Sequence, residues 1–330
     1  MPQIASSTST AREGTLKGVL QRFPFVPALV ILVALLALNG LFEPRSLSFG
    51  SLTGLVSTYL ALMLLAVAQT YVVFAGDIDL SVGSIISLVN VVIIVLMDKW
   101  GGSGLTVIAA CLIGVLTGLA CGIVNGIMIA GLRLQAIVAT FATSIFFTGL
   151  ALYVLPVAGT PAPEAYWETY GETYFGIPFV FYIVAAVAIV LGLLARMRLT
   201  TQMLAVGDDA MAAFQSGLPV TLIRIKGYML CGLFSALAAL CLTGDTASGD
   251  PLVGGKMTLY SVAAVVLGGS ALSGGAGTVT GSLVGALIIG LINSLVFFVG
   301  TPSEWQNLVQ GLAILLALMA GILVSRGARS

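Results

Sequence analysis

Apolar runs alternate with short polar or glycine-rich stretches along nearly the whole chain. A helix needs about 20 residues to cross a bilayer, and backbone in lipid must satisfy its own hydrogen bonds, so each run predicts a transmembrane helix. The pattern therefore predicts an all-α, polytopic integral membrane protein with about ten transmembrane helices, the eighth short enough to be re-entrant. The expected helices cover approximately residues 25–42, 52–75, 80–97, 105–130, 136–155, 178–195, 225–244, 258–272, 277–299 and 307–324.

The composition agrees with a lipid environment. Of the 330 residues, 59% are hydrophobic and 8% are charged, whereas soluble domains carry about 25% charged residues. The formal net charge is zero, so the chain has no overall field that would attract nucleic acid. The chain contains no histidine, and its four cysteines lie inside apolar runs at spacings that fit no metal site. We therefore expect neither a metal nor a cofactor.

Basic residues between the apolar runs predict the orientation, because cytosolic segments are enriched in lysine and arginine. With a cytosolic N-terminus, ten of the 13 basic residues face the cytosol, and the opposite orientation would place these ten outside. We expect residues 1–24 as a cytosolic tail, 25–326 as the transmembrane domain and 327–330 as a cytosolic C-terminus. Of the two long connections, 156–178 is then external and 196–226 cytosolic. The ten cytosolic basic residues are Arg12, Lys17, Arg22, Arg133, Arg196, Arg198, Arg224, Lys226, Arg326 and Arg329.

Two carboxylates, Asp77 and Asp79, stand in the stretch AGDIDLSVGS between the second and third apolar runs. At the centre of a bilayer each would cost about 2.5–3.5 kcal/mol, so their position needs a reason. Asp79 suits the N-cap of the third helix, where its carboxylate would accept N–H bonds from Ser81 or Val82. Asp77 has no such role, and an intramembrane carboxylate is a functional candidate. Helix capping and a place on the transport pathway both stay open.

Glycine recurs at every fourth position in two of the apolar runs. Such stripes let another helix approach closely where side-chain bulk would hold it away, so we expect them to serve helix packing. The stripes are Gly114, Gly118, Gly122 and Gly126 in the first run, and Gly277, Gly281 and Gly285 in the second. A fainter echo links VVFAG followed by LSVG with VVLGG followed by LSGG, which suggests a repeated unit of the fold.

The segment AVGDDAMAAFQSGLPV, residues 205–220, contains a short helical pattern. Asp208 or Asp209 would cap this helix, and Gly217 would end it before Pro219. Its small residues suit insertion into a groove on a partner protein. The residues expected to pack are Met211, Ala212 and Phe214.

The chain shows no nucleotide site or active site of its own. LVGGKM resembles a phosphate-binding loop, but Met257 replaces the required Ser or Thr and Asp250 the first glycine. A Ser-His-Asp arrangement is excluded because there is no histidine. We expect a chain that is not an enzyme.

Three stretches, in order along the chain, resemble the signatures of one family. AGDIDLSVGS, AVGDDAMAAFQSGLPV and SVAAVVLGGSALSGGAGTVTGSLVGALIIGLINS are similar to motifs of the permease subunits of bacterial ABC importers of the ribose/xylose/autoinducer-2 class, among the branched-chain amino acid/sugar permeases. The likeness covers nearly the whole chain beyond the N-terminal tail. Two departures stand out: Asp77 occupies a position that is usually Gly, and Asp209 one that is usually Asn.

The resemblance implies a permease subunit in the bacterial inner membrane that moves a small polar solute, such as a sugar or polyol, inward with ATP hydrolysed by a separate subunit. It implies an ABC ATPase, a periplasmic solute-binding protein, and a second permease copy or sister permease as partners within the lipid bilayer. The alternative is an ion-coupled secondary transporter that uses Asp77 and Asp79 as cation or proton sites. The residues implied to couple to the ATPase are Gly207, Asp209, Ala212, Ala213, Ser216 and Gly217.

Overall fold

The computed structural model describes residues 25–327, so the expected tail 1–24 and the last three residues lie outside the described part. Most of the described chain is helical. The helices are α2 (Val26–Phe42), η1 (Pro44–Leu47), α3 (Phe49–Phe74), α4 (Val82–Lys99), α5 (Gly104–Gly126), η2 (Ile127–Gly131), α6 (Ala136–Val154), α7 (Glu164–Gly171), α8 (Phe179–Arg196), α9 (Arg198–Asp208), α10 (Ala210–Gln215), α11 (Val220–Thr246), α12 (Met257–Leu267), α13 (Val279–Phe298) and α14 (Ser303–Gly327).

Four two-residue strands form two small antiparallel pairs. β1 (Thr160–Pro161) pairs with β4 (Ser248–Gly249), and β2 (Thr173–Tyr174) pairs with β3 (Ile177–Pro178). The first pair joins the segment before α7 to the connection between α11 and α12. These pairs tie the connections together at one end of the molecule.

Within residues 25–327, seven helices are long and apolar enough to cross a membrane: α3, α4, α5 with η2, α6, α8, α11 and α13. α2 and α12 are apolar but shorter, with 17 and 11 residues. The predicted all-α polytopic class is confirmed, and the count of about ten transmembrane helices stays a prediction. The eighth helix is shorter than the expected 258–272, because α12 ends at Leu267, before Gly268 and Gly269.

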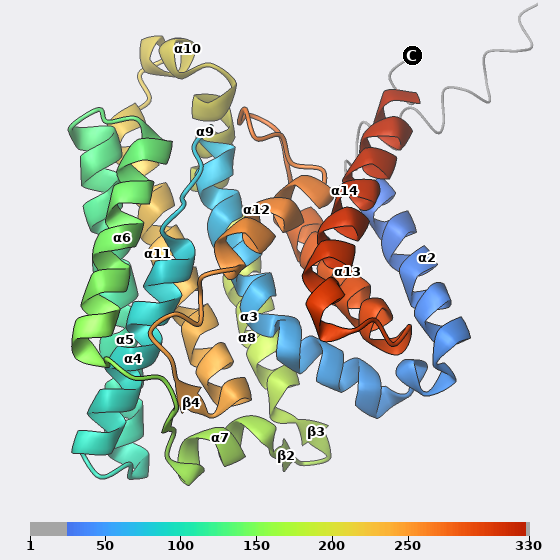
Figure 1. Cartoon of the computed structure of the whole chain (residues 1–330). Helices are drawn as coiled ribbons and strands as arrows, with labels where there is room; N and C mark the ends of the chain where they lie inside the picture. The colour runs from blue at the N-terminus through green and yellow to red at the C-terminus, as the bar shows by residue number, and fades with distance from the viewer. Residues whose placement is uncertain (1–24, 328–330) are drawn as a thin grey trace, which may run out of the picture.

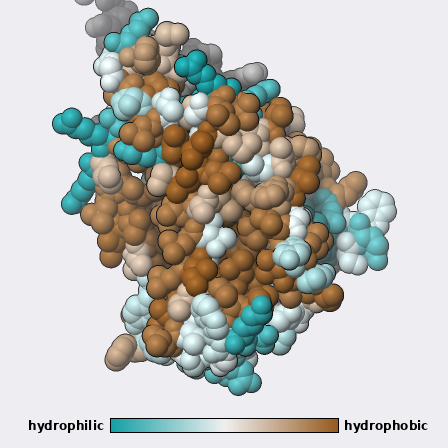
Figure 2. Space-filling view, turned by 90° about the vertical axis from the view of Figure 1, so that its left-hand side faces the viewer, coloured by the Kyte–Doolittle hydropathy of each residue, from teal (hydrophilic) through white to brown (hydrophobic). Residues whose placement is uncertain are grey.

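The helices run between two ends that differ in character. In Figure 1, α9 and α10 lie at one end, and α7 with β2 and β3 lies at the other. α2 begins, and α14 ends, at the α10 end. Figure 2 shows a broad band of hydrophobic side chains across the middle of the face that carries α6, with hydrophilic side chains gathered above and below it. This is the surface that a bilayer-spanning protein requires.

α11 lies at the centre of the bundle and packs closely on α5, which carries the first glycine stripe. A Cβ on Gly118 would lie 2.6 Å from the Cβ of Ala236, and one on Gly122 would overlap the carbonyl oxygen of Tyr228. Side-chain bulk on this face of α5 would therefore separate the two helices. In the second stripe, Gly281 and Gly285 lie in the same way against backbone carbonyls of α12 and the residue that follows it.

α7 lies across the end of the bundle opposite α10 and is held by its aromatic side chains. Tyr166 donates a hydrogen bond to the carbonyl of Leu240 (2.8 Å), and Tyr170 donates one to the carbonyl of Ser57 (3.1 Å). Burial raises the pKa of the Tyr170 phenol, so this group remains a neutral donor at ordinary pH. α7 is thereby fixed to both α3 and α11.

α3 and α12 end with the same backbone conformation. Gly76 and Gly269 have φ values of 83° and 85°. The N–H of Asp77 and that of Ser270 each donates, at 3.2 Å, to the carbonyl five residues back. This is the Schellman motif, in which the left-handed residue is usually glycine. The two stretches that echo each other in sequence are therefore alike in structure, and each leads through an irregular segment into the next helix.

Candidate functional site

The first irregular segment, residues 75–81, is called here the acidic segment. It holds Asp79 fully buried, with Oδ1 accepting hydrogen bonds from the N–H and the hydroxyl of Ser81, both at 2.7 Å. The N–H of Ser81 was an expected donor, but the expected cap position is wrong by two residues. α4 begins at Val82, and Ser81 occupies the N-cap without a side-chain cap bond. Asp79 thus closes a turn just ahead of the helix.

The other oxygen of Asp79 faces two neighbouring helices. Oδ2 accepts hydrogen bonds from Nδ2 of Asn125 on α5 (3.4 Å) and from Sγ of Cys231 on α11 (3.6 Å). Asn125 also donates to the Ser81 hydroxyl at 2.7 Å. Because a buried carboxylate is costly unless hydrogen-bonded, these donors explain how Asp79 is accommodated, and they fasten the acidic segment to α5 and α11.

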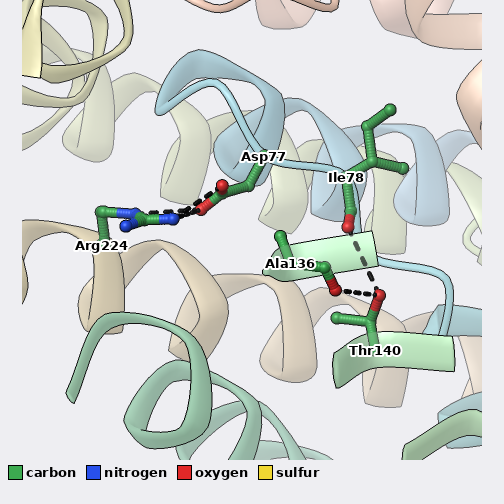
Figure 3. Close-up of polar contacts among 5 residues, drawn as sticks. All are labelled: Asp77, Ile78, Ala136, Thr140 and Arg224. Carbon is green, nitrogen blue, oxygen red and sulfur yellow. Dashed lines mark hydrogen bonds and ion pairs between the residues drawn. The ribbon is translucent and has the colours of Figure 1, made fainter. Parts of the chain in front are cut away.

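Asp77 forms an ion pair that the sequence did not suggest. Both of its oxygens accept hydrogen bonds from Arg224 in the first turns of α11, at 2.7–3.0 Å (Figure 3). This bidentate geometry is the strong form of a carboxylate–arginine contact. The residue that departs from the family pattern is therefore neutralised by a side chain 147 positions away along the chain.

A hydroxyl holds the acidic segment from another side. Thr140 on α6 accepts a hydrogen bond from the N–H of Leu80 (3.0 Å) and donates one to the carbonyl of Ala136 (2.8 Å). Figure 3 shows Arg224 and Thr140 approaching the segment from different helices. The acidic segment is thus anchored to α6 as well as to α5 and α11.

The three motifs singled out in the sequence meet through their backbones. Gly207, in the last turn of α9, lies so close to the end of α3 that a Cβ would overlap the carbonyl oxygen of Phe74 and lie 2.7 Å from the nitrogen of Gly275. A Cβ on Gly274 would lie 2.7 Å from Cα of Gly76 and 2.9 Å from Cα of Gly207. We call Gly76, Gly207, Gly274 and Gly275 the glycine junction. It joins α9, the acidic segment and the segment before α13.

The short helix α10 projects from α9 at the end of the molecule. Oδ1 of Asp209 accepts hydrogen bonds from the N–H groups of Met211 (2.8 Å) and Ala212 (3.0 Å), so Asp209 is its N-cap. Gly217, with φ 82°, follows the end of the helix. Met203 on α9 is fully buried and anchors the pair of helices to the bundle.

The side of α10 that faces outward differs from the one expected. Met211 and Phe214 are 65% and 67% exposed, and Ala212 and Ser216 are exposed as well, whereas Ala213 is 5% exposed and packs against the chain itself. Met211, Ala212 and Phe214, the residues expected to pack, are therefore not covered by the rest of the described chain. Because α10 is a six-residue helix that packs on α9 and α11, the small residue faces the core and the large apolar residues face outward.

Some residues of this region were missed by sequence reasoning. Phe74, Gly274 and Gly275 stand inside motifs noted in the sequence. The repeated glycines of these motifs could have indicated a close contact between backbones. Arg224 and Thr140 carried no signal, because their partners lie far away along the chain. The geometry as a whole can transmit a displacement of α10 through α9 to the two irregular segments that follow α3 and α12.

Comparison with known proteins agrees with this arrangement. A family model described as "Branched-chain amino acid transport system / permease component" matches residues 51–318. The ribose import permease protein of Bacillus subtilis (strain 168) is 33% identical, over 92% of this chain and 93% of that protein. The autoinducer 2 import system permease protein of Salmonella choleraesuis (strain SC-B67) is 31% identical, over 91% and 84%.

The L-arabinose ABC transporter permease protein of Azospirillum brasilense is also 31% identical, over 96% of this chain and 92% of its own. No solved structure matches the chain. The match to the family model and the identities over nearly the full length of the relatives are sufficient to assign the family. The chain therefore belongs to the branched-chain amino acid transport system permease family, as the non-catalytic permease subunit of an ABC importer.

Proposed function

We propose that this permease moves a sugar or a sugar-like polar solute into a bacterial cell, driven by ATP that a separate subunit hydrolyses. The relatives named for ribose, L-arabinose and autoinducer 2 support this solute class, because all three are small and polar. The observation that carries the mechanism is the glycine junction. Through α9, it connects the exposed helix α10 to two irregular segments. The backbone atoms there are so close that no side chain fits between them.

In this mechanism the ATPase subunit moves α10, and α9 moves with it. Gly207 then displaces the end of α3 and the segment before α13 together, because backbone atoms in contact cannot yield as a flexible side chain would. The Schellman ends of α3 and α12 are the points at which each helix is already interrupted. Alternating access then consists of two arrangements of the acidic segment and of residues 268–278, which connect α12 to α13. Each arrangement is favoured by one state of the ATPase.

The α10 end is proposed to face the cytosol of the inner membrane, with about ten spans and both termini on that side. The excess of basic residues there supports this orientation. Gln215 on α10 and Thr169 on α7 are exposed at opposite ends, which allows a direct test. With the four native cysteines replaced by alanine, an impermeant maleimide should label Thr169→Cys but not Gln215→Cys in spheroplasts. Inverted vesicles should give the reverse result.

Labelling of both variants in detergent is the control for accessibility. If Gln215→Cys is the variant labelled in intact spheroplasts, the proposed orientation is wrong.

The partners proposed on the other surfaces are a periplasmic solute-binding protein and a second permease, either a copy or a sister chain. Only 6% of the α8 span is buried within the chain, which leaves it available to pack against another subunit. At the end carrying α7, Phe175 is 99% exposed, and Trp167 and Tyr174 are exposed as well. Exposed aromatic residues of this kind are enriched in binding surfaces.

The ion-coupled alternative has less support in this structure. Asp77 is paired with Arg224, and both oxygens of Asp79 already accept hydrogen bonds, so neither carboxylate stands free for a cation. An uptake assay distinguishes the two mechanisms. The permease is reconstituted with the ATPase and binding protein encoded beside it, and a labelled pentose is supplied.

Uptake should require ATP on the α10 side and should persist when ionophores collapse ion gradients. Uptake that follows a sodium or proton gradient without ATP would reject the importer mechanism. Loss of uptake when only the binding protein is omitted would support the proposed route of delivery.

A further inference from the structure

A second element lies beside α10 at the same end of the molecule. η2 continues α5, and residues 132–135 then lead into α6. Leu132 and Leu134 in this turn are 66% and 43% exposed. Between the turn and α10 lies a groove of about 510 Å³, which we call the α10 groove. Arg133 and Leu134 line it from the turn, Met211 and Phe214 line it from α10, and Arg224 lines it from α11.

The exposed leucines of the turn lie in a connection between helices, next to α10. Figure 1 shows the connection between η2 and α6 at the end of the helices that carries α9 and α10. Exposed apolar side chains that cluster outside lipid usually mark a surface that another protein covers. The turn and α10 together form one such surface, so the groove is continuous with the helix already proposed to meet the ATPase.

The charge of the groove points to the chemistry of its occupant. Its lining includes two arginines and no carboxylate. Arg224 is engaged by Asp77, whereas the side chain of Arg133 forms no hydrogen bond or ion pair with any residue in 25–327. The backbone at Arg133 is left-handed, with φ 59°, which is unfavourable for a residue with a Cβ and tends to occur where function requires it. One guanidinium is therefore available at the rim of an apolar groove.

We propose that the α10 groove is a second docking site for the ATPase subunit, and that it receives a segment of that subunit with apolar side chains and a carboxylate that pairs with Arg133. The proposal rests on the proposed function, because it takes the ATPase to be the occupant. A segment bound there would also contact Arg224, which holds Asp77. Docking would thereby reach the acidic segment by a second route, separate from the glycine junction.

The first test measures the affinity of the ATPase subunit for the intact permease in detergent. Arg133→Glu should weaken binding about tenfold, because like charges would then meet across the interface, and Arg133→Lys should stay within about threefold of the parent. Arg198→Glu is the matched control, since it makes the same charge change at the same end without lining the groove. An equal loss in Arg198→Glu would mean general charge attraction and would overturn the proposal.

The second test does not depend on a loss of binding. A photoactivatable phenylalanine analogue in place of Leu134 should cross-link the ATPase, and the same analogue in place of Leu193, exposed on α8, should not. Ala212→Arg changes an exposed residue of α10 that does not line the groove. If Arg133→Glu binds as the parent does and the analogue at Leu134 gives no cross-link, while Ala212→Arg weakens binding, the groove is not a docking site and the proposed function stands. If Ala212→Arg also binds as the parent does, docking at this end of the molecule fails as a whole.

Discussion

Gly207→Ala should uncouple the permease and lower its stability. Gly207 lies within α9 and does not have a positive φ, so alanine can adopt the same backbone conformation. The obstacle is space: the new methyl group would overlap the Phe74 carbonyl, and its other near neighbour is the Gly275 nitrogen. Because both are backbone atoms, α9 must move away, at a cost of about 1–3 kcal/mol for overpacking.

The expected result is a lower unfolding temperature in detergent and a loss of solute-dependent uptake of about tenfold or more, with the protein still inserted in the membrane. Thermal unfolding followed by size-exclusion chromatography and uptake by proteoliposomes measure the two effects. Gly149→Ala is the matched control, because Gly149 is in α6 and a Cβ there would meet nothing within 4 Å. A Gly207→Ala protein that matches the parent in both assays would show that the glycine junction does not transmit the movement of α10.

Phe214→Ala should sharply weaken binding of the ATPase subunit. Phe214 is 67% exposed on α10, and a large aromatic side chain that inserts into a partner commonly contributes about 2 kcal/mol or more. Such a loss corresponds to an increase in Kd of about 30-fold. Titration of the purified permease with the ATPase subunit measures the change directly.

Phe175→Ala provides the control for this experiment. It removes a phenylalanine that is even more exposed, at 99%, from the opposite end of the molecule, so it should leave ATPase binding unchanged. Ala213→Arg, which the resemblance alone would favour as a test, is unsuitable because Ala213 is buried against its own chain. Equal affinity of the Phe214→Ala and parent proteins would place the ATPase contact elsewhere.

Asp77 shows how a departure from a family pattern can be absorbed locally. The additional carboxylate is balanced by Arg224, in the first turns of α11, and Arg224 also lines the α10 groove. Any force applied to the start of α11 therefore reaches the acidic segment directly. In this chain the ion pair supplements the hydrogen bonds that Thr140 and Asn125 provide.

The sequence by itself determined the class of the fold and the approximate extent of most helices. Hydropathy is a local property, and a run of apolar residues can be buried in lipid only as a helix. A transmembrane helix can therefore be predicted without knowing which other helices it contacts. The short α12 was recognisable for the same reason, although its end at Leu267 was not. Asp209 as the N-cap of α10 was one of two local choices, since a cap bonds residues only two or three positions away.

Only the tertiary structure decided how the site is assembled. The partner of Asp77 lies 147 positions away, and the glycines of the junction come from three segments that sequence spacing cannot place together. The orientation of α10 was misjudged because a helix of six residues has too few turns for its apolar periodicity to show which face is covered. Its packing on α9 and α11 sets that face, turning Ala213 inward and leaving Phe214 outside. Local patterns specify the elements, whereas long-range contacts specify which of their surfaces remain free to act.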